Sequence, residues 1–374
     1  MNSVPSLIAS LVTFAESGFI KMKKIVLTGG GTAGHVTPNI ALVPKLKESG
    51  FEIKYIGTYN GMEKQLVEDA GLDYIGISSG KLRRYFSWKN FSDPFRVLKG
   101  YFEAKKFMKK YKPDVVFSKG GFVTVPVVYA ASKYKIPVII HESDMTPGLA
   151  NKLAIKKSTK VCHNFPETAA YLGSKAVHTG SPIRKELFEG NKITALDMCG
   201  FSANKPVIMV TGGSLGAENV NKLVRKALPE LLKNFQVAHL CGKGKVDESL
   251  KDIEGYAQFE YISDEMKDFF AMADLIISRA GANSICEIAA LNKPNILIPL
   301  SARASRGDQI LNAKSYKKQG FSEVIDEDTA TAEDLVNTVN SVYENRSKYI
   351  DAMKKSAGTG GVDMIVDLIN SLVK

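Results

Sequence analysis

The chain has 374 residues, a length that predicts about two domains at ~150 residues each, and its 44% hydrophobic and 24% charged residues are ordinary for a globular protein with substantial cores. No apolar stretch reaches the ~18 to 20 uninterrupted residues of a membrane span, which excludes a spanning helix. The net charge of +11 indicates an anionic partner: a nucleic acid, a phosphorylated substrate or an acidic membrane surface.

Residues 1–21 differ from the rest of the chain, because they are mildly apolar and lack a basic start. Glu16 interrupts them, which argues against a signal peptide. Met22 directly precedes the first expected strand, so we expect Met22 to be the natural start and residues 1–21 to be a non-native leader.

From residue 24 onward, short apolar runs alternate with helical segments. Strands are expected at 24–28, 52–56, 73–77, 114–118, 137–141 and 159–162, and helices near 37–49, 61–70, 95–111, 123–134 and 147–155. The runs at 114–118 and 137–141 are continuously apolar, which is typical of parallel strands covered on both faces.

The same scheme repeats after a turn at 179–182, where we expect the two domains to join. Strands are expected near 206–210, 236–240, 257–261, 274–278 and 295–299, and helices near 216–233, 264–271, 283–291, 308–319, 330–343 and 362–373. This alternation predicts an α/β protein of two Rossmann-like, doubly wound parallel-sheet domains facing across a cleft, with ligands at the carboxyl ends of the strands.

Two of the expected strands end in a glycine-rich turn that leads into a helix, at Gly29–Gly34 and at Gly212–Gly216. Such a turn aims free backbone N–H groups and a partial positive charge at an anion, which indicates phosphate binding. The first turn matches the dinucleotide pattern G-x-G-x-x-G, but the strand at 52–56 carries no acid at its end to hold a ribose. An NAD- or FAD-dependent protein is therefore disfavoured.

Polar side chains follow three strands of the first half: His35 after the glycine turn, Lys119-Gly120-Gly121 after 114–118, and His141–Asp144 after 137–141. Carboxyl ends of neighbouring parallel strands meet at one crevice, so we expect these groups to face the same space. A histidine and two carboxylates in a cleft suit acid–base chemistry. Capping and loop hydrogen bonds are the structural alternative for each residue.

In the second half, Glu287 is expected one turn inside a helix whose start is marked by Gly281 and Asn283. A carboxylate there can accept two hydrogen bonds from a ribose diol, or it can be a first-turn acid that the helix dipole favours. The cluster Ser305–Gln309 opens the next helix with side chains that suit sugar hydroxyls and equally suit a helix cap.

Residues 81–112 mix eleven lysines and arginines with aromatic side chains. This composition fits an anionic membrane interface, where rings lie at headgroup depth; stacking on single-stranded nucleic acid and a solvated helix face are the alternatives.

Signals for a metal are weak. Asp326-Glu327-Asp328 matches the D-x-D pattern of metal-dependent sugar transferases, but we interpret it as a cap for the next helix. The cysteines are scattered and lack metal-ligand spacing, which indicates reduced thiols in a cytosolic protein. They are Cys162, Cys199, Cys241 and Cys286.

Seven motifs occur together in order and give the chain a specific resemblance. They are G-G-G-T-A-G-H-V-T-P at 29–38, K-G-G-F-V-T-V-P at 119–126, H-E-S-D-M-T-P-G-L-A-N-K at 141–152, G-S-P-I-R at 180–184, G-G-S-L-G-A at 212–217, R-A-G-A-N-S-I-C-E at 279–287 and D-Q-I-L-N-A at 308–313. From about Met22 to its end the chain closely resembles the MurG family of bacterial N-acetylglucosamine transferases of peptidoglycan synthesis.

The resemblance implies a GT-B glycosyltransferase with an acceptor and membrane-associating domain at 22–183 and a UDP-GlcNAc-binding domain at 184–357. The amphipathic helix near the end of the chain can pack on either domain, and we expect residues 358–374 to pack back on the N-terminal domain. The implied reaction is inverting transfer, without an essential metal or other cofactor, from UDP-GlcNAc to the 4-hydroxyl of the muramyl sugar of lipid I, which gives lipid II. The implied location is the cytoplasmic face of the cell membrane, as a peripheral protein, with other cell-wall synthesis proteins as candidate partners and no nucleic acid.

The same resemblance assigns roles to individual residues. His35 is the leading candidate for the catalytic base and Glu142 the second. Donor-binding candidates are Thr32, Gly34, Arg184, Ser214, Leu215, Gly216, Ile262, Asn283, Ser284, Glu287, Asp308 and Gln309. The acceptor diphosphate is expected at Gly30, Gly31, Gly120 and Gly121, and the membrane patch at Leu82, Arg83, Arg84, Tyr85, Phe86 and Trp88.

Three positions depart from the family pattern. Ala33 replaces a glycine and stiffens the first turn, Asp144 replaces an amide and puts its acceptor-binding role in doubt, and Asp308 replaces the first of two glutamines that contact the donor sugar. A GT-B epimerase acting on UDP-GlcNAc shares the donor site but does not need the basic aromatic segment. A basic nucleic-acid-binding protein is the third alternative, and it predicts salt-sensitive affinity for DNA or RNA.

Overall fold

The computed structural model describes residues 22–80, 89–213, 216–305, 307–356 and 360–373, with the side chains of 89–92 left out. The expected leader at 1–21, the candidates Ser214 and Leu215, and the expected membrane patch from Leu82 to Trp88 lie outside the described residues. None of the described helices is long and apolar enough to cross a membrane.

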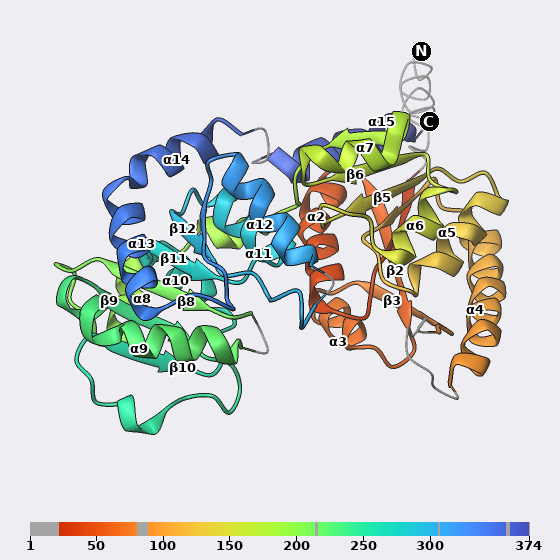
Figure 1. The fold of residues 1–374 in the computed structure, drawn as a ribbon. Helices are drawn as coiled ribbons and strands as arrows, with labels where there is room; N and C mark the ends of the chain where they lie inside the picture. Colours follow the sequence, from red (N-terminus) through yellow and green to blue (C-terminus); the bar gives the residue numbers. More distant parts are fainter. Residues whose placement is uncertain (1–21, 81–88, 214–215, 306, 357–359, 374) are drawn as a thin grey trace, which may run out of the picture.

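The described chain forms two parallel sheets, each covered by helices on both faces (Figure 1). The first sheet has the strand order β3-β2-β1-β4-β5-β6-β7, and we call it and its helices the N-terminal domain. Its strands are β1 (Lys23–Thr28), β2 (Phe51–Thr58), β3 (Asp73–Ile77), β4 (Val115–Ser118), β5 (Val138–Glu142), β6 (Lys160–His163) and β7 (Ala176–His178). Its helices are α2 (Thr37–Glu48), α3 (Met62–Asp69), α4 (Lys89–Tyr111), α5 (Thr124–Lys133), α6 (Leu149–Ile155) and α7 (Ala169–Leu172).

The second sheet repeats this plan with the order β10-β9-β8-β11-β12-β13, and we call it and its helices the C-terminal domain. Its strands are β8 (Val207–Thr211), β9 (Gln236–Leu240), β10 (Tyr256–Phe259), β11 (Leu275–Ser278), β12 (Asn295–Leu297) and β13 (Glu323–Val324). Its helices are α8 (Lys192–Cys199), α9 (Glu218–Asn234), α10 (Met266–Met272), α11 (Ala282–Ala290), α12 (Asp308–Lys318), α13 (Ala332–Glu344) and α14 (Arg346–Lys354).

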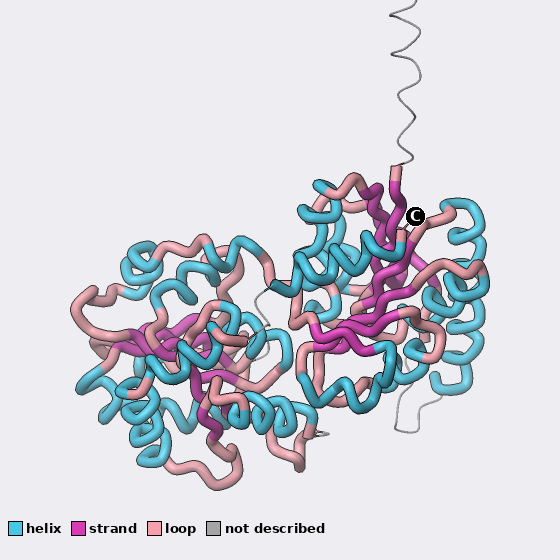
Figure 2. The backbone as a smooth tube through the Cα atoms, turned by 90° about the horizontal axis from the view of Figure 1, so that it is seen from above, coloured by secondary structure: helices cyan, strands magenta, loops and turns pink. Residues whose placement is uncertain are grey.

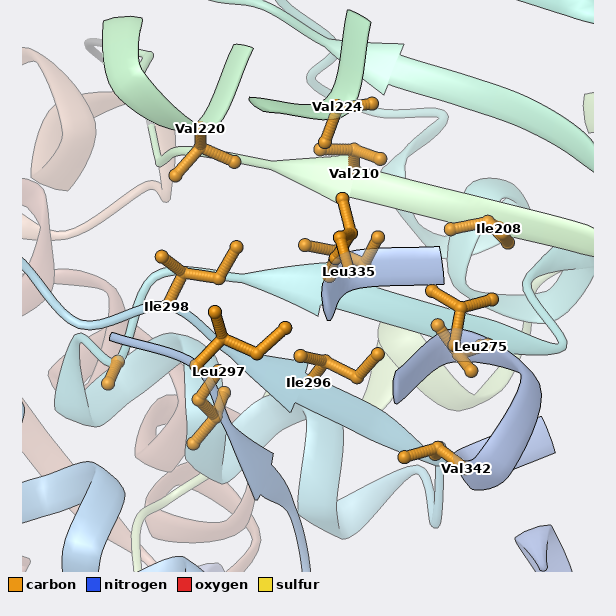
Figure 3. Close-up of a cluster of buried hydrophobic side chains, with 14 of the residues drawn as sticks. Ile208, Val210, Val220, Val224, Leu275, Ile296, Leu297, Ile298, Leu335 and Val342 are labelled. Atoms are coloured by element: carbon orange, nitrogen blue, oxygen red, sulfur yellow. The ribbon is translucent and has the colours of Figure 1, made fainter. Parts of the chain in front are cut away.

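Alternation of side chains along the strands builds two cores in each domain. Ile25 and Leu27 of β1 pack beneath α2, whereas Val26 between them packs on the opposite face beneath α4 and α5. In the C-terminal domain, Ile208 and Val210 of β8 join the cluster drawn in Figure 3. Because both faces are buried, these strands are continuously apolar, which is the pattern that predicts them from sequence.

All eleven predicted strands are confirmed, with ends within two residues of the prediction. The predictions omit β7 and β13, which are short strands at the sheet edges, and the helices α7, α8 and α14. Helix α4 begins at Lys89 rather than at 95, because Pro94 removes one backbone hydrogen bond near the helix start without ending the helix.

The last helix, α15 (Gly361–Leu372), leaves the C-terminal domain and packs beside α2 on the N-terminal domain (Figure 1). Its residues Ile365, Val366 and Ile369 are buried in the same core as Ile25 and Leu27. The Lys23 ammonium donates a hydrogen bond to Asn370 Oδ1 at 3.1 Å. The end of α15 therefore lies beside β1, the strand with which the described chain begins (Figure 2).

Replacing Ile365 with alanine is expected to lower the free energy of unfolding by about 2 to 5 kcal/mol, because the side chain is fully buried in the N-terminal core. The matched control is Met364→Ala on the exposed face of α15, for which we expect a change within about 0.5 kcal/mol. Urea denaturation followed by circular dichroism measures both. Equal effects for the two variants would show that α15 does not contribute to the core.

Candidate active site

The two glycine turns of the N-terminal domain pack directly against each other. Gly30 N–H donates a hydrogen bond to Gly120 O at 3.3 Å, and a Cβ on Gly121 would lie 2.2 Å from Gly30 O. Gly31, Gly120 and Gly121 all have positive φ angles, which residues with a side chain rarely adopt. The chain therefore needs glycine here, and the predicted acceptor loops lie together at the carboxyl ends of β1 and β4.

His35 lies at the end of a short 3-10 helix, η1 (Ala33–His35), between the glycine turn and α2. Its Nδ1 is 3.0 Å from Gly30 O and 3.2 Å from Thr32 Oγ1, and because a carbonyl only accepts, Nδ1 carries the hydrogen. The lone pair is then on Nε2. Burial and the positive charge of Lys119 lower the pKa of His35, so the ring is neutral at neutral pH.

Glu63, at the start of α3, is a residue of this site that the sequence reading missed. Its carboxylate accepts hydrogen bonds from Thr58 N–H at 2.9 Å, Thr58 Oγ1 at 2.6 Å and Gly31 N–H at 3.3 Å. These bonds outweigh the effect of burial and lower the pKa of Glu63. One amide of the expected anion loop is thus already paired with a protein carboxylate. In the sequence, Glu63 is recognisable only as an acid in the first turn of the helix that follows β2.

Glu142, the second candidate base, is enclosed beneath the cleft. The side chain of Asn151 donates to its carboxylate at 2.8 Å, and the N–H groups of Asp144 and Gly148 donate at 3.1 Å. Burial raises the pKa of Glu142 to about 7. With both oxygens held and 4% of the residue exposed, Glu142 organises the turn after β5 and does not face the cleft.

The two domains meet through polar contacts across the cleft. Asn283 of α11 donates to Gly34 O at 3.0 Å, which places the predicted donor helix against the predicted acceptor loop. Asn312 of α12 donates to Asp144 Oδ1 at 3.1 Å and accepts from Met145 N–H at 3.1 Å. Asp144, which departs from the family pattern, therefore bonds to the other domain.

Arg184, Asn283 and Glu287 line one small interdomain cavity together with Thr37 and Pro38 of α2. Buried Arg184 Nε and Asn283 Oδ1 have no hydrogen-bond partner. Burial raises the pKa of Glu287 to about 7, although the charge of Arg184 opposes this shift. The cavity measures about 10 Å³, which is room for a single water. Ser284 lies beside Asn283 in the first turn of α11.

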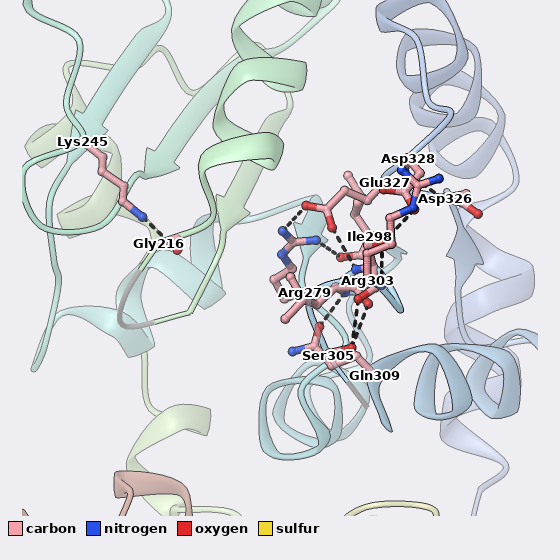
Figure 4. Close-up of polar contacts among 12 residues, drawn as sticks. Gly216, Lys245, Arg279, Ile298, Arg303, Ser305, Gln309, Asp326, Glu327 and Asp328 are labelled. Atoms are coloured by element: carbon pink, nitrogen blue, oxygen red, sulfur yellow. Dashed lines mark hydrogen bonds and ion pairs between the residues drawn. The ribbon is translucent and has the colours of Figure 1, made fainter. Parts of the chain in front are cut away.

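The glycine turn after β8 is described only at its ends. Gly216 has a φ of +66°, and a Cβ there would lie 2.0 Å from Cys241 O, so the turn packs closely on the loop after β9. The Lys245 ammonium of that loop donates to Gly216 O at 3.2 Å (Figure 4). Lys245 places a cation beside the expected phosphate turn, and the sequence reading missed it because no motif marks it.

The loop before α12 is held by an internal ion pair (Figure 4). Buried Arg279 pairs with Glu327, whose other oxygen accepts from Ser301 N–H at 2.9 Å. Asp328 accepts from Ser301 Oγ at 2.7 Å. The interpretation of Asp326–Asp328 as a helix cap is wrong: Thr331 and Asp334 form the capping box of α13, and Glu327 and Asp328 instead anchor this loop.

Three remaining candidates have definite positions. Gln309 Oε1 accepts from Leu300 N–H at 3.0 Å and so holds the loop before α12. Asp308 Oδ1 lies 3.5 Å from Thr146 Oγ1 of the other domain. The side chain of Ile262 is buried in the C-terminal domain, which leaves its backbone to meet a ligand. Within the described ranges, no three His, Cys, Asp or Glu side chains gather as a metal site.

Two Rossmann-like domains with glycine turns at opposing strand ends define the GT-B class of glycosyltransferases. The N-terminal domain of glycosyltransferase family 28 matches residues 25–163, and its C-terminal domain matches residues 207–368. Two relatives are 64% identical, one from Lachnospira eligens over 93% of this chain and 99% of its own, and one from Lachnoclostridium phytofermentans over 94% and 99%. Both are named UDP-N-acetylglucosamine–N-acetylmuramyl-(pentapeptide) pyrophosphoryl-undecaprenol N-acetylglucosamine transferase.

Among solved structures, MurG of Acinetobacter baumannii is 28% identical, covers 93% of this chain and 99% of its own, and has a TM-score of 0.72. The chain belongs to the MurG family. A UDP-GlcNAc 2-epimerase from Neisseria meningitidis, at 13% identity and a TM-score of 0.68 over 94% of this chain and 100% of its own, shares the fold alone.

Replacing Glu327 with glutamine leaves the buried Arg279 charge without its counter-ion, so we expect a loss of about 3 to 5 kcal/mol in the free energy of unfolding. We also expect faster hydrogen exchange at Ser301 N–H. The control is Glu230→Gln, which removes an exposed pair with Lys233 and is expected to change stability by no more than about 1 kcal/mol. Unchanged exchange at Ser301 would argue against the anchoring role.

Proposed function

We propose that this protein transfers N-acetylglucosamine from UDP-GlcNAc to the 4-hydroxyl of the muramyl sugar in undecaprenyl-pyrophosphoryl-MurNAc-peptide, lipid I, and so forms lipid II for peptidoglycan. The observation that carries this proposal is the 64% identity, over nearly the whole of both chains, to transferases whose names state this donor and this acceptor. The convergence of Arg184, Asn283 and Glu287 opposite His35 and the paired glycine turns supports it.

In this proposal residues 22–183 bind the acceptor, residues 184–357 bind the donor, and residues 358–374 complete the acceptor domain. The buried side chains of α15 in the N-terminal core support the last assignment. Glu287 accepts hydrogen bonds from the ribose diol, and the backbone at Ile262 meets the uracil. Thr32, Gly34, Asn283 and Ser284 border the donor where the domains meet, and Asp308 and Gln309 face its sugar.

The donor diphosphate binds at the turn after β8, which includes Ser214, Leu215 and Gly216. Arg184 and the N-terminus of α11 supply positive charge, and Lys245 adds an ammonium beside Gly216 O. These groups stabilise the negative charge that builds on UDP as its bond to the sugar breaks. The acceptor diphosphate binds along Gly30, Gly31, Gly120 and Gly121.

His35 is the general base in this mechanism. Its Nδ1–H is held by Gly30 O, so Nε2 accepts the proton of the acceptor hydroxyl. The hydroxyl oxygen attacks the anomeric carbon of the donor sugar from the face opposite the diphosphate. The new C–O bond forms as the bond to the diphosphate breaks, UDP leaves with the electron pair, and the configuration at the carbon inverts.

The acceptor carries a long lipid, and an exposed face of α4 fits a membrane surface. Phe95, Leu98 and Phe102 follow at helical spacing and are 76%, 53% and 56% exposed. With Lys99 and Lys106 they line one open hollow. Apolar side chains flanked by lysines suit an anionic bilayer interface. In our proposal the protein binds peripherally to the cytoplasmic face of the cell membrane through this face of α4. The neighbouring segment 82–88 also contacts the membrane in this proposal.

The proposed reaction is tested with UDP-GlcNAc and a short-chain lipid I analogue. Replacing His35 with glutamine should leave donor affinity unchanged and lower turnover by about 10² or more, because the base is lost. Replacing Glu287 with alanine should weaken UDP-GlcNAc binding roughly 10- to 100-fold, since its hydrogen bonds to the ribose diol are lost, and should leave acceptor affinity nearly unchanged. Coupled detection of UDP and calorimetry measure these effects.

The control for both variants is Glu333→Ala, an exposed acid on α13, which should behave like the unaltered protein. Consumption of UDP-GlcNAc without a disaccharide product would overturn the transferase and favour the epimerase alternative. Normal turnover of His35→Gln would remove the base assignment alone.

Replacing Phe95 and Phe102 together with serine should reduce binding to vesicles that contain anionic lipid, because both exposed rings are lost from the interface. Turnover of a detergent-soluble acceptor should not change. The control is Tyr171→Ser, an exposed ring on α7. Vesicle co-sedimentation and the transfer assay measure the two properties, and an equal loss in both would contradict a membrane role for this face.

A further inference from the structure

Lys119 is a lysine enclosed beneath the cleft, directly after β4 and before the glycine pair 120–121. Only 1% of the residue is exposed. The backbone N–H of Lys119 donates to Thr28 O at 2.9 Å. The side-chain ammonium donates to His141 Nδ1 at 2.7 Å and to Ser143 Oγ at 2.5 Å. A lysine this deeply buried is rare without a carboxylate partner, and here both ammonium partners are neutral groups.

The first partner is neutral because its hydrogen bonds fix its protonation. His141 Nδ1 accepts from the ammonium, so its hydrogen is on Nε2, which lies 2.9 Å from Gly180 O. Burial and the charge of Lys119 lower the pKa of His141 well below its usual range. The lysine charge is therefore not cancelled by direct contact.

Other titratable groups surround Lys119 at longer range. They are Glu142, Asp144, Cys162 and, from α11 of the C-terminal domain, Cys286. Burial raises the pKa of both thiols, so both are neutral at pH 7. Burial lowers the pKa of Lys119 to about 8, and because an amine is charged below its pKa, most of the lysine keeps its charge at pH 7.

His35 packs against the turn that Lys119 begins. A Cβ on Gly120 would lie 3.5 Å from Cδ2 of His35, which places the imidazole ring against the residue that follows the lysine. On its other side the Glu63 carboxylate holds Gly31. Burial has the largest effect on the pKa of His35 and lowers it. Of the charged groups, Lys119 lowers this pKa further and Glu63 raises it.

We propose that Lys119 is a positioning residue for His35, one that holds the turn beneath the imidazole and whose buried charge keeps that ring unprotonated when anionic substrates fill the cleft. This inference rests on the proposed function. Two diphosphates entering the site would favour the imidazolium, which cannot accept the acceptor proton. The buried ammonium opposes this effect and cannot be reached by the phosphates. The Glu63 carboxylate limits how far the pKa of His35 falls, so that His35 remains basic enough to accept the proton.

The test is an NMR titration of the histidines, ¹³C-labelled at Cε1, in the protein without substrates, with His35 assigned through His35→Gln. Lys119→Met retains the shape and removes the charge, so the pKa of His35 should rise by about one unit. Glu63→Gln removes the opposite charge, so the pKa of His35 should fall. Lys175→Met is the control, a half-buried lysine that donates to Ile155 O away from the cleft, and it should leave His35 unchanged.

Unchanged or same-direction shifts in Lys119→Met and Glu63→Gln would overturn the proposal, since a structural role alone gives no opposite signs. If Lys119→Met fails to fold, Lys119→Arg replaces it as the test of charge: with the charge kept, the pKa of His35 should match the unaltered protein, and a rise would overturn the proposal.

The kinetic arm separates this inference from the proposed function. If the unaltered protein transfers N-acetylglucosamine, the acid limb of kcat/KM should move to higher pH in Lys119→Met, in step with the titration. An unmoved limb would overturn the role of Lys119 in the reaction. If the unaltered protein shows no transfer, the proposed function fails, while the NMR shifts still decide whether Lys119 sets the protonation of His35.

Discussion

The contact between Gly30 and Gly121 is the constraint on which the site depends. A side chain at either position would meet backbone or a buried carboxylate at less than 3 Å, so the turns after β1 and β4 can approach only as glycine. Their approach sets the imidazole of His35 against Gly120 and brings Gly31 to Glu63. The positions of Lys119, Glu63 and His35 are therefore set by the backbone of the two turns rather than by direct contacts among these three side chains.

The second determinant of the site is the contact between the domains. Asn283 and Asn312 each bond to backbone or carboxylate of the N-terminal domain, and Phe165 from the N-terminal half packs on Tyr316 of α12. In this arrangement the cavity at Arg184 and Glu287 has room for a single water. Separating the domains would break these polar bonds and would also expose Phe165, which is buried in the core of the C-terminal domain.

Much of the fold could be predicted from the sequence, because both faces of each central strand are buried and the strands read as apolar runs. The edge strands β7 and β13 lack that signal, since they are short and partly exposed. Motifs located His35, Arg184, Asn283 and Glu287, but they could not show which neighbours set the protonation of His35 and Glu287. Glu63 and Lys119 are both buried. Sequence patterns predict that charged side chains are exposed, so they do not identify these two residues. The acids at 326–328 were misassigned because Arg279, the partner of Glu327, is distant in sequence.

The return of α15 to the first domain bears on how the protein is made. The apolar face of α15 fills the core beneath β1, so that core lacks Ile365 and Ile369 until the end of the chain has left the ribosome. Domains usually fold as units in the order of synthesis. Here the first sheet to emerge must wait, partly uncovered, while the whole second domain is translated, and the C-terminal domain can finish folding before the N-terminal one.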